Sequence, residues 1–199
     1  MKDVPILLFP KVYEKIEDFK KEYHSPFANN FYYILLSLIK CPICNYVLKA
    51  EIKDNSGVSS FIPLNVLDAG KVSDLLKQYM SNLTNYSHFN YSCQNCTYYG
   101  PGKNEVEFLN SPKYLLFRLE GEKQITLDNS IDLTNYNLEK SRNNKYNLLS
   151  FIAKENNKFK AYIKFDRQTW CKFNEENVME KNVFITNYIP YISIYEKEI

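Results

Sequence analysis

Four of the five cysteines in this chain of 199 residues occur as two pairs, and each pair has the spacing of a metal-binding turn. The pairs are Cys41-Pro-Ile-Cys44 and Cys93-Gln-Asn-Cys96. Two thiolates separated by two residues can reach one ion through a tight turn, and two such turns complete a tetrahedral four-sulfur zinc site. Because four protein ligands leave no position for water, we expect one zinc ion with a structural rather than a catalytic role, bound by Cys41, Cys44, Cys93 and Cys96.

Disulfides and redox pairs are the alternative uses of this spacing. A reducing compartment disfavours disulfides, and the presence of two pairs in one chain disfavours a redox role. Structural zinc contributes on the order of 10 kcal/mol to folding, which is enough to hold a lobe that has little core of its own. The fifth cysteine, Cys171, lies between Trp170 and Lys172 in a predicted strand, where we expect a small buried residue.

The composition predicts one domain over residues 1–199. Hydrophobic residues make up 45% of the chain and aromatic residues 16%, which is enough to form one core at this length. The apolar run from Pro5 to Phe9 is too short for the core of a signal peptide, and no run approaches the roughly 18 apolar residues of a membrane span. We therefore expect an intracellular protein, in the cytoplasm or the nucleus, that does not contact a membrane.

Three parts of the domain are predicted from hydrophobic periodicity. Residues 1–40 are expected to form an N-terminal helical segment. Its apolar residues recur at helical spacing, at Val12, Ile16, Phe19 and Tyr23. Residues 41–100 are expected to form a zinc-ribbon lobe with an inserted helix. The helix would have one apolar face, made by Val72, Leu75, Leu76, Tyr79 and Met80.

Residues 101–199 are rich in strand patterns separated by short turns, which predict a mostly antiparallel sheet and an α+β fold. The predicted strands are VEFL, KYLLFRLE, ITLDNSIDL, YNLLSFIA, FKAYIKF and PYISIYEK. Two further strands, YVLKAEI and FIPLNV, are predicted between the cysteine pairs. The helices are therefore confined to the first half of the chain.

The order of these elements resembles the ubiquitin-specific protease family, in which two CxxC pairs build a lobe called the fingers. Pro112 to Leu119 resembles the family's "P-x-x-L-x-x-x-L-x-R-F" strand. Trp170 to Val178 fits "W-x-x-F-[DN]-D-x-x-V", and Pro190 to Glu196 resembles the closing "A-Y-x-L-F-Y-E". NSIDLTNY and KYNL match two further segments, so the resemblance extends from Phe31 to Glu196. It implies a palm of antiparallel strands over residues 101–199, with zinc-ribbon fingers and no thumb.

The catalytic residues of the resembled family are where this sequence departs from it. The family's nucleophilic cysteine lies in a "G-N-T-C-Y-x-N-S" box, and the nearest local match places Phe31 at the cysteine position. The family's histidine lies in a "G-H-Y-x-A/S-Y" turn, where this chain has Lys158. Asn174 matches the residue that orients that histidine, while His24 and His88 fall outside the motif. An ammonium with a pKa near 10 is no base at neutral pH unless strongly desolvated, so we expect no enzymatic activity.

A basic segment is the candidate binding surface. Between Lys140 and Lys172 there are nine Lys or Arg residues and two acids. Strand alternation in FKAYIKF would direct Phe159, Ala161, Ile163 and Phe165 towards a core. The opposite face would then present Lys158, Lys160, Tyr162 and Lys164, which suits phosphates and occasional stacking, although a solvated strand face has the same pattern.

Three functions are consistent with these observations. The first is a zinc-stabilised, non-catalytic relative of the proteases that serves as a binding or scaffold subunit of a larger assembly, and the basic face favours a ribonucleoprotein such as the ribosome or spliceosome. The second is a module that binds ubiquitin or a ubiquitin-like fold. The third is a deubiquitinase completed by a separate chain. None of the three involves a small-molecule substrate.

Overall fold

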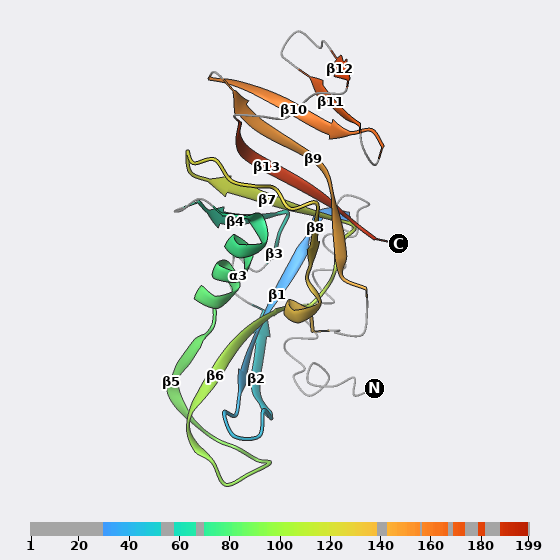
Figure 1. Ribbon diagram of the computed structural model, residues 1–199. Coiled ribbons are helices and arrows are strands. Elements are labelled where there is room, and N and C mark those ends of the chain that lie inside the picture. Colours follow the sequence, from blue (N-terminus) through green and yellow to red (C-terminus); the bar gives the residue numbers. More distant parts are fainter. Residues whose placement is uncertain are drawn as a thin grey trace. The chain divides into compact units, whose positions relative to one another are not determined.

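The computed structural model describes residues 30–52, 58–66, 70–138, 143–155, 157–166, 169–173, 179–181 and 188–198 (Figure 1). The chain divides into two compact units, each built from segments that are distant in the sequence. The first unit is Met1–Ser59 with Met80–Pro112 and Asn135–Ser141, and the second is Ser60–Tyr79 with Lys113–Thr134 and Arg142–Ile199. The predicted helix through Val12, Ile16, Phe19 and Tyr23 lies outside the described residues.

The first unit contains a sheet with strand order β2-β1-β6-β5, and β3 pairs with the start of β1. Its strands are β1 (Tyr33–Lys40), β2 (Val47–Ile52), β3 (Val58–Ser59), β5 (Asn85–Ser92) and β6 (Tyr99–Phe108). β1 is central because it pairs antiparallel with both β2 and β6. Leu36 and Leu38 of β1 pack with Ala50 of β2 in a buried cluster, which explains the apolar sequence of this strand.

The second unit contains a larger sheet with strand order β12-β11-β10-β9-β13-β7-β4, and β8 pairs with β9 (Figure 1). Its strands are β4 (Phe61–Asn65), β7 (Tyr114–Glu120), β8 (Ser130–Asp132), β9 (Lys145–Glu155), β10 (Lys158–Lys164), β11 (Trp170–Phe173), β12 (Met179–Lys181) and β13 (Ile189–Lys197). Among the described residues, every pairing between its strands is antiparallel except that of β4 with β7, which is parallel. The predicted antiparallel palm sheet and the α+β class are confirmed.

The predicted helix is also confirmed, as α3 (Val72–Asn82), and a short 3-10 helix, η2 (Thr134–Tyr136), follows β8. The first turn of α3 is capped by Asp128, whose Oδ2 accepts a hydrogen bond from the Ser73 backbone N–H at 2.8 Å. Val72, Leu76 and Met80 are almost fully buried, as the helical apolar face requires. Within the described residues, no helix is long and apolar enough to cross a membrane.

Three predicted boundaries differ from the structure. Residues 33–40 form strand β1 rather than part of a helical segment, because this strand is buried between β2 and β6. Residues 101–108 were expected in the palm but belong to β6, which pairs with β1 from Lys40↔Lys103 to Leu35↔Phe108. Helix α3 was expected in the zinc lobe, but its residues up to Tyr79 belong to the second unit.

Candidate functional site

The two cysteine pairs come together at one end of the first unit's sheet. The Sγ atoms of Cys41, Cys44, Cys93 and Cys96 all lie within 4.8 Å of one another. Cys41 and Cys96 are 3.6 Å apart, as are Cys44 and Cys93, and all four are free thiols. Four sulfurs at about 2.3 Å from a tetrahedral ion would be separated by about 3.8 Å, so these distances fit a four-sulfur zinc site and are far too long for disulfides of about 2.05 Å.

Both cysteine turns have the same backbone design. The N–H of Cys41 donates to the carbonyl of Tyr46 at 2.8 Å, and the N–H of Cys93 donates to that of Tyr98 at 3.0 Å. Asn45 adopts a φ of 58°, a left-handed conformation that asparagine tolerates and that closes the first turn. Each turn therefore folds its two thiols back over the end of a strand pair, and the pairing of β1 with β6 brings the two turns together.

The pKa values of two thiols in the cluster shift in opposite directions. Against a hydrogen bond from the Tyr98 backbone, burial and the other three cysteines raise the pKa of Cys96 to about 12, whereas Cys44 is favoured as the thiolate, the form that binds metal. A hydrogen bond from the Asn95 side chain and one from the Tyr46 backbone lower the pKa of Cys44 to about 6. Cys41 and Cys93 are buried, whereas Cys44 and Cys96 are partly exposed. The four cysteines can therefore bind a metal ion such as zinc, and the sequence prediction of the ligand set agrees with this geometry.

A partly buried ion network lies beside the first cysteine turn. The Lys40 ammonium contacts Glu105 at 2.7 Å and Glu107 at 2.9 Å, and Lys103 contacts Glu105 at 2.6 Å. Burial alone would lower the pKa of Lys40, but the hydrogen bonds and charges of both glutamates outweigh it and raise the pKa. This network holds β1 and β6 in register directly next to Cys41.

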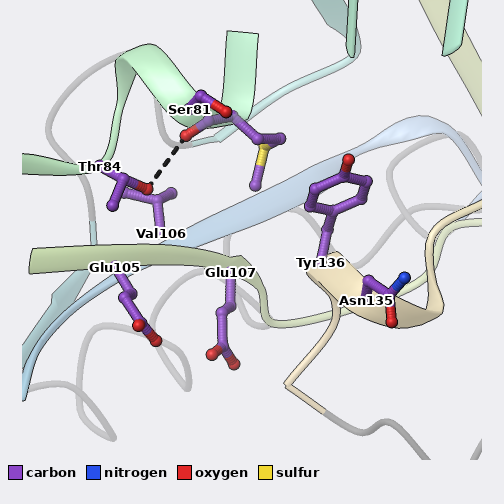
Figure 2. A pocket seen from close by; sticks show the side chains of 8 residues that line it. Ser81, Thr84, Glu105, Val106, Glu107, Asn135 and Tyr136 are labelled. Atoms are coloured by element: carbon purple, nitrogen blue, oxygen red, sulfur yellow. Dashed lines mark hydrogen bonds between the residues drawn. The ribbon is translucent and has the colours of Figure 1, made fainter. Parts of the chain in front are cut away.

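A cavity of about 400 Å³ lies on the other side of β6 (Figure 2). It is lined by Met80, Ser81, Thr84, Glu105, Val106, Glu107, Asn135 and Tyr136. Figure 2 shows the Glu105 and Glu107 carboxylates pointing away from Ser81 and Thr84, on the side of β6 opposite Val106. Since both carboxylates bind Lys40 instead, they do not form an acid–base pair facing this cavity.

In the second unit, a carboxylate at the end of β9 organises the neighbouring strands. The Glu155 carboxylate accepts hydrogen bonds from Lys160 at 2.6 Å and from the Tyr162 hydroxyl, and it lies 3.2 Å from the Lys172 ammonium. Burial alone would raise the pKa of Glu155, but these three partners outweigh it and lower the pKa. The result is a mostly buried cluster with two cations and one anion.

An aromatic layer lies beneath the Glu155 cluster. Tyr162 stacks on Phe151 with ring centroids 4.6 Å apart and an interplanar angle of 9°. Trp170 meets Phe151 edge-on at 5.3 Å, and Tyr188 also contacts Phe151 at 5.2 Å. Tyr162 is therefore a core residue of this unit.

The predicted orientation of β10 is wrong. Tyr162 has an exposed fraction of 0%, whereas Phe159, Ile163 and Phe165 are exposed by 51%, 42% and 73%. The alternation was right but its phase was reversed, because the Tyr162 ring completes the aromatic layer while the Lys160 ammonium binds Glu155. The four residues Lys158, Lys160, Tyr162 and Lys164 therefore do not form an open basic face, although Lys158 itself is exposed.

Comparison with known proteins gives the family. A family model described as ubiquitin carboxyl-terminal hydrolase matches residues 5–195. The chain belongs to this family. A search of the curated proteins finds no match to the chain.

Several solved structures have a similar fold. A form of the SAGA Ubp8/Sgf11/Sus1/Sgf73 DUB module matches with a TM-score of 0.72 and 17% identity, over 97% of this chain and 47% of that chain. The SAGA DUB module bound to monoubiquitin matches with a TM-score of 0.61 and 18% identity, over 94% and 48%. A yeast SAGA DUB module matches with a TM-score of 0.58 and 18% identity, over 94% and 45%. The chain thus spans about half the length of the solved structures that it matches.

The turn that aligns with the hydrolase family's "G-H-Y" motif lies between β9 and β10. Asn157 has a φ of 63°, a left-handed conformation at the position where the motif has glycine. Lys158 follows as the first residue of β10, paired across the turn with Glu155. Asn174, which matches the orienting residue of the motif, lies outside the described residues.

Sequence reasoning missed the ion cluster that Glu155 forms with Lys160 and Lys172. In the sequence Glu155 is one acid in a basic segment, and the register of β9, β10 and β11 is needed to see that Lys160 and Lys172 approach it. The alternation of β10 was a signal that could have found the cluster, since Lys160 and Tyr162 share a face. Cys171 is buried in β11, as predicted.

Proposed function

We propose that this chain is a non-catalytic member of the ubiquitin carboxyl-terminal hydrolase family that serves as a binding or scaffold subunit of a larger assembly. The observation that supports this most directly is the residue content of the β9–β10 turn. Asn157 has a left-handed backbone at the position where the motif has glycine, and Lys158 stands where the family has its histidine base. Lysine is a hydrogen-bond donor without the neutral-pH base function that histidine has, so position 158 lacks the family's general base.

The remaining histidines and cysteines of the chain support the same proposal. The sequence contains two histidines, of which His88 lies on β5 in the first unit and His24 lies outside the described residues. Four of the five cysteines form the candidate metal site, and the fifth, Cys171, is buried in β11. A nucleophile needs an exposed thiol next to a base. Within this chain we assign neither role.

We assign one structural zinc ion to Cys41, Cys44, Cys93 and Cys96. With four sulfur ligands the ion has no open position for water, so it would supply folding free energy and no catalysis. Its role in the proposal is to fix the end of the first unit's sheet, where Ile43 and Tyr99 are both 70% exposed. Those two side chains would be available to a partner.

A protein partner is the form of assembly with most support. The similar solved structures are complexes of several proteins, and one of them is bound to monoubiquitin. Ubiquitin or a ubiquitin-like fold is therefore the second candidate partner. The ribonucleoprotein version of the proposal, in the cytoplasm or the nucleus, has less support, because Lys160 and Lys172 are used by Glu155.

The test of the proposal is hydrolysis of a ubiquitin–fluorophore substrate by the zinc-loaded chain. We expect no turnover by the chain or by its Lys158→His variant, because restoring the base alone does not supply a nucleophile. Turnover by the unchanged chain, alone or with a partner chain present, would overturn the proposal. Titration with ubiquitin, followed by the NMR signals of Ile43 and Tyr99, separates the ubiquitin-binding function from a scaffold that does not bind it.

A further inference from the structure

One face of the second unit's sheet carries apolar side chains that are half-buried or exposed. Strand register places three rows on this face across β10, β9 and β13. The rows are Phe159–Lys154–Ile189, Ala161–Ile152–Ile192 and Ile163–Ser150–Ile194. Opposite residues of an antiparallel pair share a face, so these nine side chains lie together. We call them the outer face.

The outer face differs from the opposite side of the same three strands. None of its nine residues is fully buried, and Phe159 and Ile163 are exposed by 51% and 42%. The other side contains Phe151, Tyr162 and Ser193, all at 2% exposure or less. An antiparallel sheet that buries one face in the core can be stable with its other face polar and solvated. Apolar side chains on the outer face therefore indicate that a partner protein covers it.

An aromatic pair stands at the edge of the outer face. Tyr191 lies at the bulge in β13, is 44% exposed, and contacts the Phe159 ring at 5.5 Å with an interplanar angle of 56°. Aromatic and aliphatic side chains of this kind form the centre of protein–protein interfaces. Single-stranded nucleic acid would instead need rings that lie flat and open for base stacking, and two rings tilted against each other do not offer that.

The charges at the Phe159 end of the outer face are basic, whereas two acids, Asp166 and Glu196, lie beyond Ile163 and Ile194 at its other end. Lys154 lies directly across from Phe159, and it is the one charged residue in the three rows. Lys158 directly precedes Phe159 at the start of β10, so a second lysine lies near the aromatic pair. A second copy of the chain would place these lysines against themselves, which disfavours self-association. A partner with acidic side chains would be complementary in charge to these lysines.

We propose that the outer face binds an acidic segment of a partner protein, whose apolar side chains cover Phe159, Ile163 and Tyr191 and whose carboxylates pair with Lys154. This inference rests on the proposed function and specifies the surface and the partner chemistry. It also predicts selectivity, because a basic segment would be repelled by Lys154.

The test is site-specific photo-crosslinking in cells that make the full chain. The photoreactive amino acid p-benzoylphenylalanine replaces Phe159, and in a matched control it replaces Phe89, which is 74% exposed on β5 in the other unit. Because both positions are exposed, neither replacement should affect folding, which Trp170 fluorescence checks. We expect crosslinks from position 159, well above those from position 89, to a protein segment rich in Asp, Glu and apolar residues. Adding Lys154→Glu should reduce their yield by about tenfold.

The inference would be overturned if position 159 gave no more crosslinks than position 89, or if Lys154→Glu left the crosslink yield unchanged. It would also be overturned if the crosslinked partner were a basic segment, an RNA or a second copy of the chain. Failure here is distinguishable from failure of the proposed function. A chain that does not hydrolyse the ubiquitin substrate but migrates within a large assembly on a sucrose gradient would keep the proposed function and lose only this surface.

Discussion

Replacing Glu155 with glutamine tests whether the carboxylate at the end of β9 stabilises the second unit. The wild-type carboxylate is the partner of Lys160 at 2.6 Å and of Lys172 at 3.2 Å, and the three side chains are only 15 to 19% exposed. Glutamine keeps the size of the side chain but removes its charge. Two ammonium groups would then share a mostly buried site without an anion.

The expected loss in the free energy of unfolding lies between two limits. Exposed ion pairs contribute under about 1 kcal/mol, whereas breaking a buried pair costs about 3–5 kcal/mol. Since these side chains retain some solvent contact, we expect Glu155→Gln to lower the free energy of unfolding by about 2–3 kcal/mol. Removing one cation as well, in Glu155→Gln with Lys160→Gln, should recover part of that loss because it relieves the repulsion between the two lysines.

Urea unfolding followed by the fluorescence of Trp170 is the assay. Trp170 is the one tryptophan of the chain and packs on Phe151 beneath the cluster, so it reports on this unit. With a slope of about 2 kcal/mol per molar urea, the midpoint should fall by about 1–1.5 M at pH 7. Lys154→Gln, on the outer face of the same strand, is the matched control and should change the midpoint little.

The pH dependence gives a second readout. The pKa of Glu155 is lower in the folded chain than its ordinary value of 4.5. Its contribution is therefore fully present above about pH 4.5 and is lost as the pH falls through the lower folded value. The wild type should lose more stability than Glu155→Gln between pH 6 and pH 3. A midpoint within 0.2 M of wild type at pH 7, or parallel pH curves, would refute the reasoning.

Two further predictions concern the first unit. A strong chelator should remove one zinc ion per chain and unfold the β1–β2 and β5–β6 turns, as should Cys93→Ser. Native mass spectrometry and circular dichroism measure both effects, and a chain that keeps its spectrum after metal removal would contradict a structural role. Gly102→Ala should destabilise the chain by about 1–3 kcal/mol, because a Cβ there would clash with Cγ2 of the stiff Ile39 side chain. Gly70→Ala, where nothing lies within 4 Å, is the matched control, and equal unfolding midpoints for the two variants would count against this packing argument.

The metal ligands and most strands could be predicted because their signals are local. Two cysteines at a fixed spacing need only a tight turn, and the alternation of β7, β9 and β13 needs only one buried face. The limits of the units could not be predicted in this way. β6 extends from the second cysteine turn along most of β1. Nothing in the sequence of β6 indicates whether its last residues pair in the first unit's sheet or in the second unit's sheet.

The phase of β10 failed for a different reason. FKAYIKF has an apolar set and a lysine-rich set on alternate residues, and transfer free energies alone assign the apolar set to the core. The structure reverses this because Tyr162 is larger than Ala161 and completes a stack with Phe151, while a single acid, Glu155, accepts both the Tyr162 hydroxyl and the Lys160 ammonium. A charge can enter a protected site when its counter-ion is already there, and that counter-ion is contributed by the preceding strand.

This reversal also separates what the fold requires from what the chemistry of the family requires. The β9–β10 turn needs a residue that accepts a left-handed backbone, and Asn157 supplies it with a φ of 63°. The inner side of β10 needs an aromatic ring at position 162, which stacks on Phe151. Position 158 needs neither a left-handed backbone nor a buried aromatic ring. Because it is exposed, the fold tolerates a lysine there as well as a histidine. Under the proposed function, the base was therefore free to change while the positions that hold the sheet together were kept. The apolar outer face, which the sheet does not need for its own stability, is then the part of the palm where selection for a partner would act.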